Sequence, residues 1–239
     1  MTEARGVLLF VFEGDTFKVA DGAQPPKAGS LLFCRHLHAR PGERVLEIGT
    51  GIGLAAVRAA RAGARVIATD VVEAAVRCAR ENAALNGVAE LVDVRLGDAF
   101  APVRGLVFDL ICTSPPQMPT PPDRERSDAM AAADNGGRDG WALLDRVIAA
   151  APAHLRPGGR LVFTLFGFLG VKAALGKLAE AGLEPAILGQ ETQGFPRIGY
   201  ERLEHIRALD AEGTLPRSGW PATVERYVVQ GTKAEGDPR

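Results

Sequence analysis

The sequence has few of the residues that build disulfide-stapled or metal-stapled domains. Its 239 residues include three cysteines, Cys34, Cys78 and Cys112, which lie far apart and form no Cys-x-x-Cys or Cys/His pair. Neither a disulfide framework nor a structural zinc site is therefore expected. The four histidines share no catalytic or metal-ligand spacing, so no bound metal is predicted.

An excess of one charge and long apolar runs are also missing. Lys and Arg total 28 against 29 Asp and Glu, which gives a formal net charge of -1. Proteins that coat nucleic acid usually carry a basic excess, so a nucleic-acid partner is not expected. The apolar segment near the start holds only about six residues before charge returns, too few to cross a bilayer. The sequence predicts a soluble, cytoplasmic protein with no membrane partner and leaves its oligomeric state open.

The chain does have 46% hydrophobic residues, enough for one substantial core, and glycines and prolines that punctuate it. We expect an N-terminal hairpin and helix over 1–40, a main domain over 41–232, a flexible tail over 233–239 and a candidate lid at 114–140. Alternating elements predict an α/β fold with a parallel, doubly wound sheet. The expected strands span 7–12, 16–20, 44–48, 65–69, 91–95, 107–113, 160–165, 185–189 and 224–231, and the expected helices span 30–38, 54–62, 71–85, 141–154, 171–181 and 200–209.

A glycine-rich turn follows the expected strand at 44–48. Gly49, Gly51 and Gly53 alternate ahead of the next helix, where missing side chains let the backbone approach a polar ligand. The spacing is not the Gly-x-Gly-x-x-Gly of dinucleotide-binding turns, and no Lys-Ser or Lys-Thr follows as in phosphate loops. Glu47 stands two residues before the turn, and Asp70 ends the next strand.

This pattern resembles the class I S-adenosylmethionine-dependent methyltransferases over roughly residues 26–190. The resemblance implies a Rossmann-like sheet of seven strands, mostly parallel with the last strand antiparallel, and S-adenosylmethionine as cofactor with S-adenosylhomocysteine as product. It implies that Glu47 holds the amino end of the cofactor, that Asp70 accepts hydrogen bonds from the ribose hydroxyls, and that Asp98 and Ala99 clamp the adenine. The cofactor-binding residues implied in this way are Ser30, Glu47, Gly49, Thr50, Gly51, Gly53, Asp70, Val71, Asp98, Ala99 and Ser114.

These acids also have structural alternatives. Glu47 and Asp70 could interact with helix N-termini, where a carboxylate contributes a fraction of a kcal/mol. Asp98 follows a glycine, and Gly-Asp is an ordinary turn pair.

A second motif, Ser114-Pro115-Pro116-Gln117, ends the expected strand at 107–113. It resembles the Asn-Pro-Pro-Tyr or Ser-Pro-Pro-Tyr signature of methyltransferases that act on planar nitrogen in nucleobases or glutamine side chains. The resemblance implies that the first side chain and the first proline's carbonyl accept hydrogen bonds from the target NH2 group, and marks Ser114, Pro115, Pro116 and Gln117 as the candidate catalytic residues. Gln117 stands where the family has an aromatic, and the motif could also simply end a strand.

Two glycine-containing segments have counterparts in the same family. The segment 134–140 resembles a Gly-Gly-x-Asp-Gly segment of protein-glutamine and related methyltransferases, although Asp139 could instead cap the next helix. The segment 26–30 lies where those enzymes have a proline-acid-threonine segment, but the acid is missing, and Ser30 could contact the methionine end or cap a helix. Phe166 is one of several candidate pocket aromatics, for most of which packing is the favoured role.

The absence of a basic excess and of an aromatic at Gln117 favours one function. We expect N-directed methyl transfer from S-adenosylmethionine to a small amine, amide or heterocyclic nitrogen, with a small-molecule acceptor as the partner. Methylation of a protein glutamine or an RNA base is the alternative within the same chemistry. A cofactor-binding protein without catalytic activity is the alternative from another class.

Overall fold

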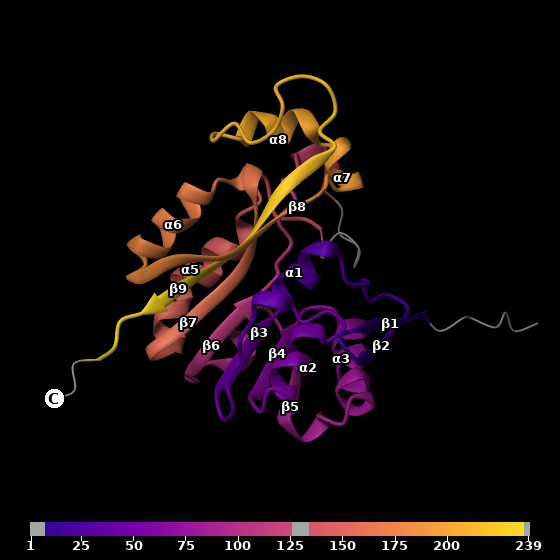
Figure 1. Ribbon diagram of the computed structural model, residues 1–239, viewed down its shortest axis with the longest axis vertical. Coiled ribbons are helices and arrows are strands. Elements are labelled where there is room, and N and C mark those ends of the chain that lie inside the picture. The colour runs from indigo at the N-terminus through magenta and orange to yellow at the C-terminus, as the bar shows by residue number, and fades with distance from the viewer. Residues whose placement is uncertain (1–7, 126–133, 237–239) are drawn as a thin grey trace, which may run out of the picture.

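The computed structural model describes residues 8–125 and 134–236 (Figure 1). Residue 7 of the first expected strand, residues 126–133 of the candidate lid and residues 237–239 of the expected tail therefore lie outside the described part. The strands are β1 (Leu8–Phe12), β2 (Asp15–Val19), β3 (Arg44–Ile48), β4 (Arg65–Asp70), β5 (Val92–Leu96), β6 (Phe108–Thr113), β7 (Leu155–Phe166), β8 (Leu183–Gly194) and β9 (Thr223–Lys233). The helices are α1 (Ala28–His36), α2 (Leu54–Arg61), α3 (Glu73–Leu85), α5 (Ala142–His154), α6 (Val171–Glu180), α7 (Arg197–Tyr200) and α8 (Leu203–Leu209).

Seven strands form one sheet in the order β5-β4-β3-β6-β7-β9-β8. The pairs from β5 to β7 are parallel, whereas β9 is antiparallel to both β7 and β8. The predicted seven-stranded sheet with an antiparallel last strand is therefore confirmed. The strand order reverses between β3 and β6, and ligands of open α/β sheets bind outside the carboxyl ends of the strands at such a switch point.

Two apolar layers cover the two faces of this sheet, because successive strand residues point to opposite faces. In β3, Val45 packs in the layer under α1, α2 and α3, whereas Leu46 and Ile48 pack in the layer under α5 and α6. Both layers are visible in Figure 1 as helices on either side of the sheet. The helical covering on both faces holds the ends of β3 and β6 in place.

The N-terminal hairpin, β1 and β2, is a separate two-stranded sheet. Its second strand is attached to α3 by two asparagines one helical turn apart. Asn86 Oδ1 accepts a hydrogen bond from Thr16 N at 3.1 Å, and Asn82 Oδ1 accepts one from Lys18 N at 2.8 Å. These side chains satisfy the free edge of β2, which strand pairing alone leaves open.

Three expected elements differ from the structure. Residues 156–159, expected as a turn, lie within β7, where the partner in β6 jumps from Phe108 opposite Leu155 to Leu110 opposite Arg160, so the intervening residues loop out as a bulge. The strand expected at 185–189 runs from 183 to 194 because β9 pairs with it along that whole length. The helix expected at 200–209 is broken between α7 and α8, where Arg202 has a non-helical φ of -123° and its buried side chain donates to Thr120 Oγ1.

Among the described residues, no helix combines the length and the apolar character needed to cross a membrane. The strand β9 extends through Lys233, the first residue of the expected tail.

Candidate functional site

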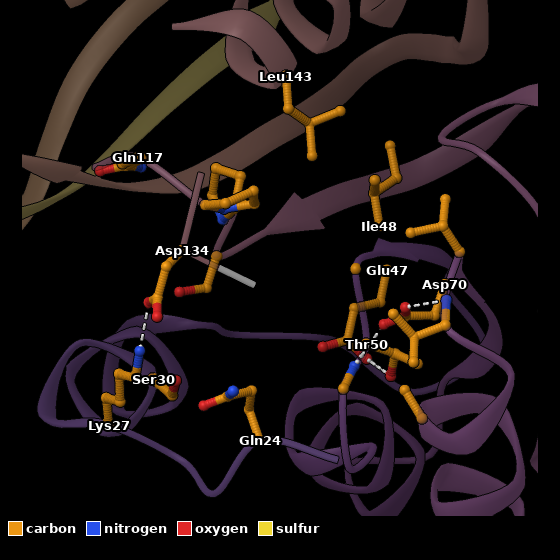
Figure 2. A pocket seen from close by; sticks show the side chains of 18 of the residues that line it. Gln24, Lys27, Ser30, Glu47, Ile48, Thr50, Asp70, Gln117, Asp134 and Leu143 are labelled. Carbon is orange, nitrogen blue, oxygen red and sulfur yellow. Dashed lines mark hydrogen bonds and ion pairs between the residues drawn. The ribbon is translucent and has the colours of Figure 1, made fainter. Parts of the chain in front are cut away.

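A cavity of about 450 Å³ opens at the carboxyl ends of β3, β4 and β6 (Figure 2). Its wall combines the start of α1, the glycine turn after β3, the loops after β4, β5 and β6, and parts of α5, β7 and β9. The predicted site residues that line it are Ser30, Glu47, Gly49, Thr50, Gly51, Asp70, Val71, Asp98, Ala99, Ser114, Pro115, Pro116 and Gln117. Segments far apart in the sequence thus meet in one cavity.

The glycine turn presents bare backbone to this cavity. Gly49 and Gly51 have φ values of +74° and +56°, and a Cβ added at either would meet no atom within 4 Å. The turn is fixed from behind, because the backbone N–H groups of Gly49 and Thr50 both donate to the Thr69 carbonyl, at 2.8 and 3.1 Å. An open cradle of this kind fits the flat approach of a ligand chain.

Gly53, the third glycine of the motif, has a different role. It does not line the cavity; it precedes the first residue of α2 at a φ of +84°. A Cβ there would lie 3.1 Å from the Ala79 Cα atom, so Gly53 allows α2 and α3 to approach closely. Gly53 thus lies outside the cavity wall and has a packing function, and its contact with the cofactor stays a prediction.

Glu47 supplies a buried carboxyl group beside the glycine turn. Its side chain is 5% exposed, and Thr50 Oγ1 donates a hydrogen bond to Oε2 at 2.6 Å (Figure 2). Burial raises the pKa of Glu47 to about 7. A cationic ligand group nearby would favour the ionised form and offset the cost of that burial.

Asp70 ends β4 with both carboxylate oxygens partly engaged. Gly51 N donates to Oδ2 and Val72 N donates to Oδ1, each at 2.9 Å. Each oxygen keeps acceptor capacity for one more donor, which suits two adjacent hydroxyl groups. Burial raises the pKa of Asp70 above its usual range. Val71, which follows directly, adds an exposed apolar surface to the cavity wall.

The loop after β5 forms the far wall of this side of the cavity. The Asp98 carboxylate pairs with Arg146 of α5 at 2.6 Å, so one of its oxygens is already engaged by a cation. Ala99 is buried at a φ of +45°, which is uncommon for a residue with a Cβ and costs about 1 to 2 kcal/mol. Backbone strain of this kind persists where the surrounding structure holds a residue in place, and it is common at binding sites.

The loop after β6 forms the opposite side of the cavity and is held rigidly. Ser114 Oγ lies 3.1 Å from Thr164 Oγ1 of the neighbouring strand β7, and the two prolines fix their own φ angles. Gly136 and Gly140 pack against the Gln117 backbone so closely that an added Cβ would lie 2.6 Å from Gln117 C and 2.7 Å from Gln117 O. The glycines of segment 134–140 therefore support the Ser-Pro-Pro-Gln loop. Asp139 also accepts a hydrogen bond from Trp141 N at the start of α5.

The Gln117 side chain is turned into the protein. It is 2% exposed, its Nε2 donates to the Thr164 carbonyl, and its Oε1 accepts from Phe166 N at 3.0 Å. The amide that replaces the family's aromatic thus fastens the loop to β7. In Figure 2 this side chain and the Glu47, Thr50 and Asp70 cluster lie on opposite sides of the view.

Three contributors to the cavity were missing from the predicted site. Lys27 and Asp134 form an ion pair of 2.5 Å near Ser30 (Figure 2), and Arg226 lies over the Phe166 ring with 3.4 Å between its Cζ and the ring centroid. Phe166 was a candidate pocket aromatic, but nothing in the sequence pairs it with Arg226, 60 positions away on another strand. Lys27 and Asp134 belong to segments that the sequence had marked, without indicating their contact.

The fold and the cavity together indicate the class of enzyme to which the protein belongs. A sheet of order β5-β4-β3-β6-β7-β9-β8 with β9 antiparallel, a bare glycine turn after β3 and an acid after β4 are the features of a class I S-adenosylmethionine-dependent methyltransferase. The open glycine cradle, the buried Glu47 and the two-oxygen acceptor Asp70 fit the cofactor's chain, amino group and ribose in chemistry.

Comparison with known proteins defines the family. Residues 23–126 match the Methyltransferase small domain. The chain is 33% identical over 181 residues to a Methanocaldococcus jannaschii protein provisionally named protein N5-glutamine methyltransferase, covering 75% of this chain and 90% of that protein. It is 35% identical over 207 residues to the release factor glutamine methyltransferase of Cereibacter sphaeroides, covering 81% of this chain and 71% of that protein.

Solved structures agree on the fold. A T. thermophilus 16S rRNA methyltransferase in complex with AdoMet and guanosine superposes with a TM-score of 0.60 at 18% identity, covering 95% of this chain and 50% of that chain. The chain therefore belongs to the methyltransferase small-domain family of the class I S-adenosylmethionine-dependent methyltransferases. The members of this family are enzymes. The alternative of a cofactor-binding protein without catalytic activity is therefore not supported.

The expected small-molecule acceptor was wrong. The relatives just described are named for glutamine in proteins, among them release factors, and not for small amines or heterocycles. The expectation had rested on the absence of a basic excess and on Gln117 in place of an aromatic. The Gln117 side chain is bonded to β7, so it gives no information about the acceptor.

Proposed function

We propose that the protein transfers the methyl group of S-adenosylmethionine to the side-chain amide nitrogen of a glutamine in a protein partner. One observation carries this proposal: the Ser-Pro-Pro loop and the glycine turn with Glu47 and Asp70 line the same cavity from opposite sides. The similarity to glutamine methyltransferases over 90% of one relative's length supports the same substrate class.

On the cofactor side, each residue has a chemical task. We assign the amino group of the cofactor to Glu47, its ribose hydroxyls to Asp70, and its adenine to the wall formed by Val71, Asp98 and Ala99. The backbone of 49–51 receives the chain between amino group and sulfur. When bound, the cofactor supplies a methyl group on a cationic sulfur.

On the acceptor side, the task is orientation. An amide nitrogen is a poor nucleophile because its lone pair is delocalised into the carbonyl group. Acceptors at Ser114 Oγ and the Pro115 carbonyl would bind the two N–H hydrogens and aim the lone pair at the methyl group, as an effect of proximity and alignment. The new C–N bond forms as the S–C bond breaks, and the extra proton on nitrogen leaves through those acceptors to solvent.

Transfer of labelled methyl groups tests this proposal. The purified protein would be incubated with methyl-labelled S-adenosylmethionine and, in separate reactions, purified bacterial release factors or total bacterial RNA, and any labelled peptide would be sequenced by mass spectrometry. We expect label on one glutamine, and we expect a Ser114→Ala variant to transfer at least about tenfold more slowly when saturated with S-adenosylmethionine. Label on RNA or on a residue other than glutamine would refute the proposed acceptor.

A further inference from the structure

Arg226 of β9, at the acceptor side of the cavity, forms no ion pair with any acidic residue of 8–125 or 134–236. Its Nε is shielded from solvent and has no hydrogen-bond partner in the described part of the chain. Its Nη1 makes one long contact, 3.4 Å, with Gln117 Oε1. Burial lowers the pKa of the Arg226 guanidinium to about 9, so the group is charged at neutral pH but poorly stabilised.

The guanidinium is nevertheless held in one place. Arg226 pairs with Phe166 across β7 and β9, and its charged group stacks 3.4 Å above the ring, which itself stacks on Phe168 with 4.8 Å between centroids. Such cation–π contacts stabilise an arginine without neutralising it. The plane is therefore fixed while its charge stays available.

Gly29 of α1 makes room for this arrangement. A Cβ at Gly29 would lie 2.5 Å from Arg226 Nη2 and 2.8 Å from its Nε, so any side chain there would displace the guanidinium. The first turn of α1 contains no acidic residue that could pair with it. The start of α1 thus leaves space for the Arg226 guanidinium and supplies no counter-charge to it.

Charges removed from water in proteins are normally paired or hydrogen-bonded, because an unpaired charge there is unfavourable. Arg226 lines the same cavity as Ser114, Pro115 and Pro116, where the acceptor would lie. With Nε shielded and Nη1 near Gln117, Nη2 and the outer side of Nη1 are the donors left for a ligand.

We infer that Arg226 binds a carboxylate carried by the acceptor segment next to the methylated glutamine, so that the preferred acceptor is an acidic peptide. The inference rests on the proposed function for the position of the acceptor. Guanidinium and carboxylate match in shape and charge. The carboxylate can come from an Asp or Glu side chain or from a free chain end.

Peptide pairs separate these sources. Four acetylated peptides would be titrated into the complex of the protein with S-adenosylhomocysteine: Ala-Gln-Glu-Ala and Ala-Gln-Gln-Ala with amidated ends, and Ala-Gln-Gln and Ala-Gln with free carboxyl ends. We expect at least one carboxylate peptide to bind about tenfold more tightly than the neutral amidated peptide. A preference for the first peptide identifies a side chain, and a preference for a free-ended peptide identifies a chain terminus.

Three variants test whether Arg226 causes the preference. Arg226→Gln should abolish it, and Gly29→Ala should reduce it by displacing the guanidinium without removing the charge. The matched control Arg217→Gln removes an exposed arginine outside the cavity wall and should keep the preference. Unchanged affinity for S-adenosylhomocysteine in all three shows that the variants are folded. Equal binding of charged and neutral peptides by the unaltered protein, or a preference that survives in Arg226→Gln, overturns the inference.

Two further measurements separate this inference from the proposed function. Methyl transfer to the same peptides reports on glutamine as acceptor: transfer without carboxylate preference overturns only the Arg226 inference, and preference without transfer overturns only the glutamine proposal. Titration of 15N-arginine-labelled protein with sodium acetate needs no peptide at all. A shift of the Arg226 Nε–H resonance, assigned by its loss in Arg226→Gln, supports the carboxylate site, and an unmoved resonance counts against it.

Discussion

The two sides of the cavity are built in different ways. The cofactor side consists mainly of short turns at the ends of β3, β4 and β5, whose contacts include Glu47 with Thr50, three positions away, and Asp70 with Gly51, 19 positions away. The acceptor side joins residues from distant parts of the chain, such as Gln117, Phe166 and Arg226. Short turns suit the binding of a cofactor that is always the same. Contacts between distant residues can be altered by single substitutions without changing those turns. This difference suits one cofactor combined with variable acceptors.

We expect the largest effect on cofactor binding at Gly51, where bare backbone meets the ligand. Gly51→Val places a branched side chain at a φ of +56° and into open cavity space. We expect S-adenosylhomocysteine affinity to fall more than about 100-fold, because steric exclusion adds to a backbone cost of about 1 to 2 kcal/mol. Calorimetry measures this loss.

Gly87→Val is the matched control for that variant. Gly87 also has a positive φ, +70°, with open space around it, but it lies at the end of α3 outside the cavity wall. It should lose comparable stability and keep its cofactor affinity. Equal loss of affinity in both variants would show that strain rather than cavity contact is responsible.

Asp70→Ala should have the next largest effect. Removing the carboxylate that we assign to the ribose hydroxyls should weaken S-adenosylhomocysteine binding by about 1.5 to 3 kcal/mol. Asp93→Ala removes an exposed carboxylate of neighbouring β5 and should leave the affinity unchanged. An unchanged dissociation constant in Asp70→Ala would remove Asp70 from the site.

Glu47 should make cofactor affinity depend on pH. Because its pKa is about 7 in the ligand-free protein, a cationic amino group gains its full partner only when Glu47 is ionised. Affinity should therefore rise several-fold from about pH 6 to pH 7.5 and level off above it. Glu47→Gln should flatten this dependence, and a profile that stays the same would contradict the assignment.

The raised pKa of Glu47 has the opposite effect on stability: cofactor affinity rises with pH, but the free energy of unfolding falls. The folded protein holds the Glu47 proton more tightly than an unfolded chain with the ordinary value of 4.5 does. The contribution of Glu47 to the free energy of unfolding therefore falls as pH rises from about 4.5 to 7 and is constant above that range. Bound cofactor should reduce this fall.

Gln117→Leu should have the smallest effect on cofactor affinity. It removes two hydrogen bonds to β7 and leaves the Thr164 carbonyl and Phe166 N without these partners, at a cost of about 1 to 3 kcal/mol in unfolding free energy. Urea unfolding measures this cost, and Gln190→Leu, which alters an exposed glutamine bonded to Glu225, should cost much less. If Gln117→Leu weakened the cofactor as strongly as Asp70→Ala does, the two sides of the cavity would not be separable.

The same contrast explains what could be predicted from the sequence. Strand, turn and acid follow one another within a few residues around Glu47 and Gly51, so their spacing alone indicates the turn and its ligand. The contact of Arg226 with Phe166 depends on the pairing of β7 with β9, which no local pattern encodes. The role of Gln117 was missed for the same reason, because its partners lie 47 and 49 positions away. The break at Arg202 likewise depends on a distant group, Thr120.

Because of the bulge in β7, the number of residues before Arg160 does not determine how β7 aligns with β6 next to the site. Residues 156–159 lie outside the ladder, and pairing resumes at Arg160, so that Thr113 stands opposite Phe163 and Ser114 reaches Thr164. A residue gained or lost in this bulge would change the loop and leave every later partner in place, whereas the same change after Arg160 would reverse which side chains face α5. Insertions and deletions can therefore accumulate at 156–159 without disturbing the frame in which the acceptor loop meets its neighbour.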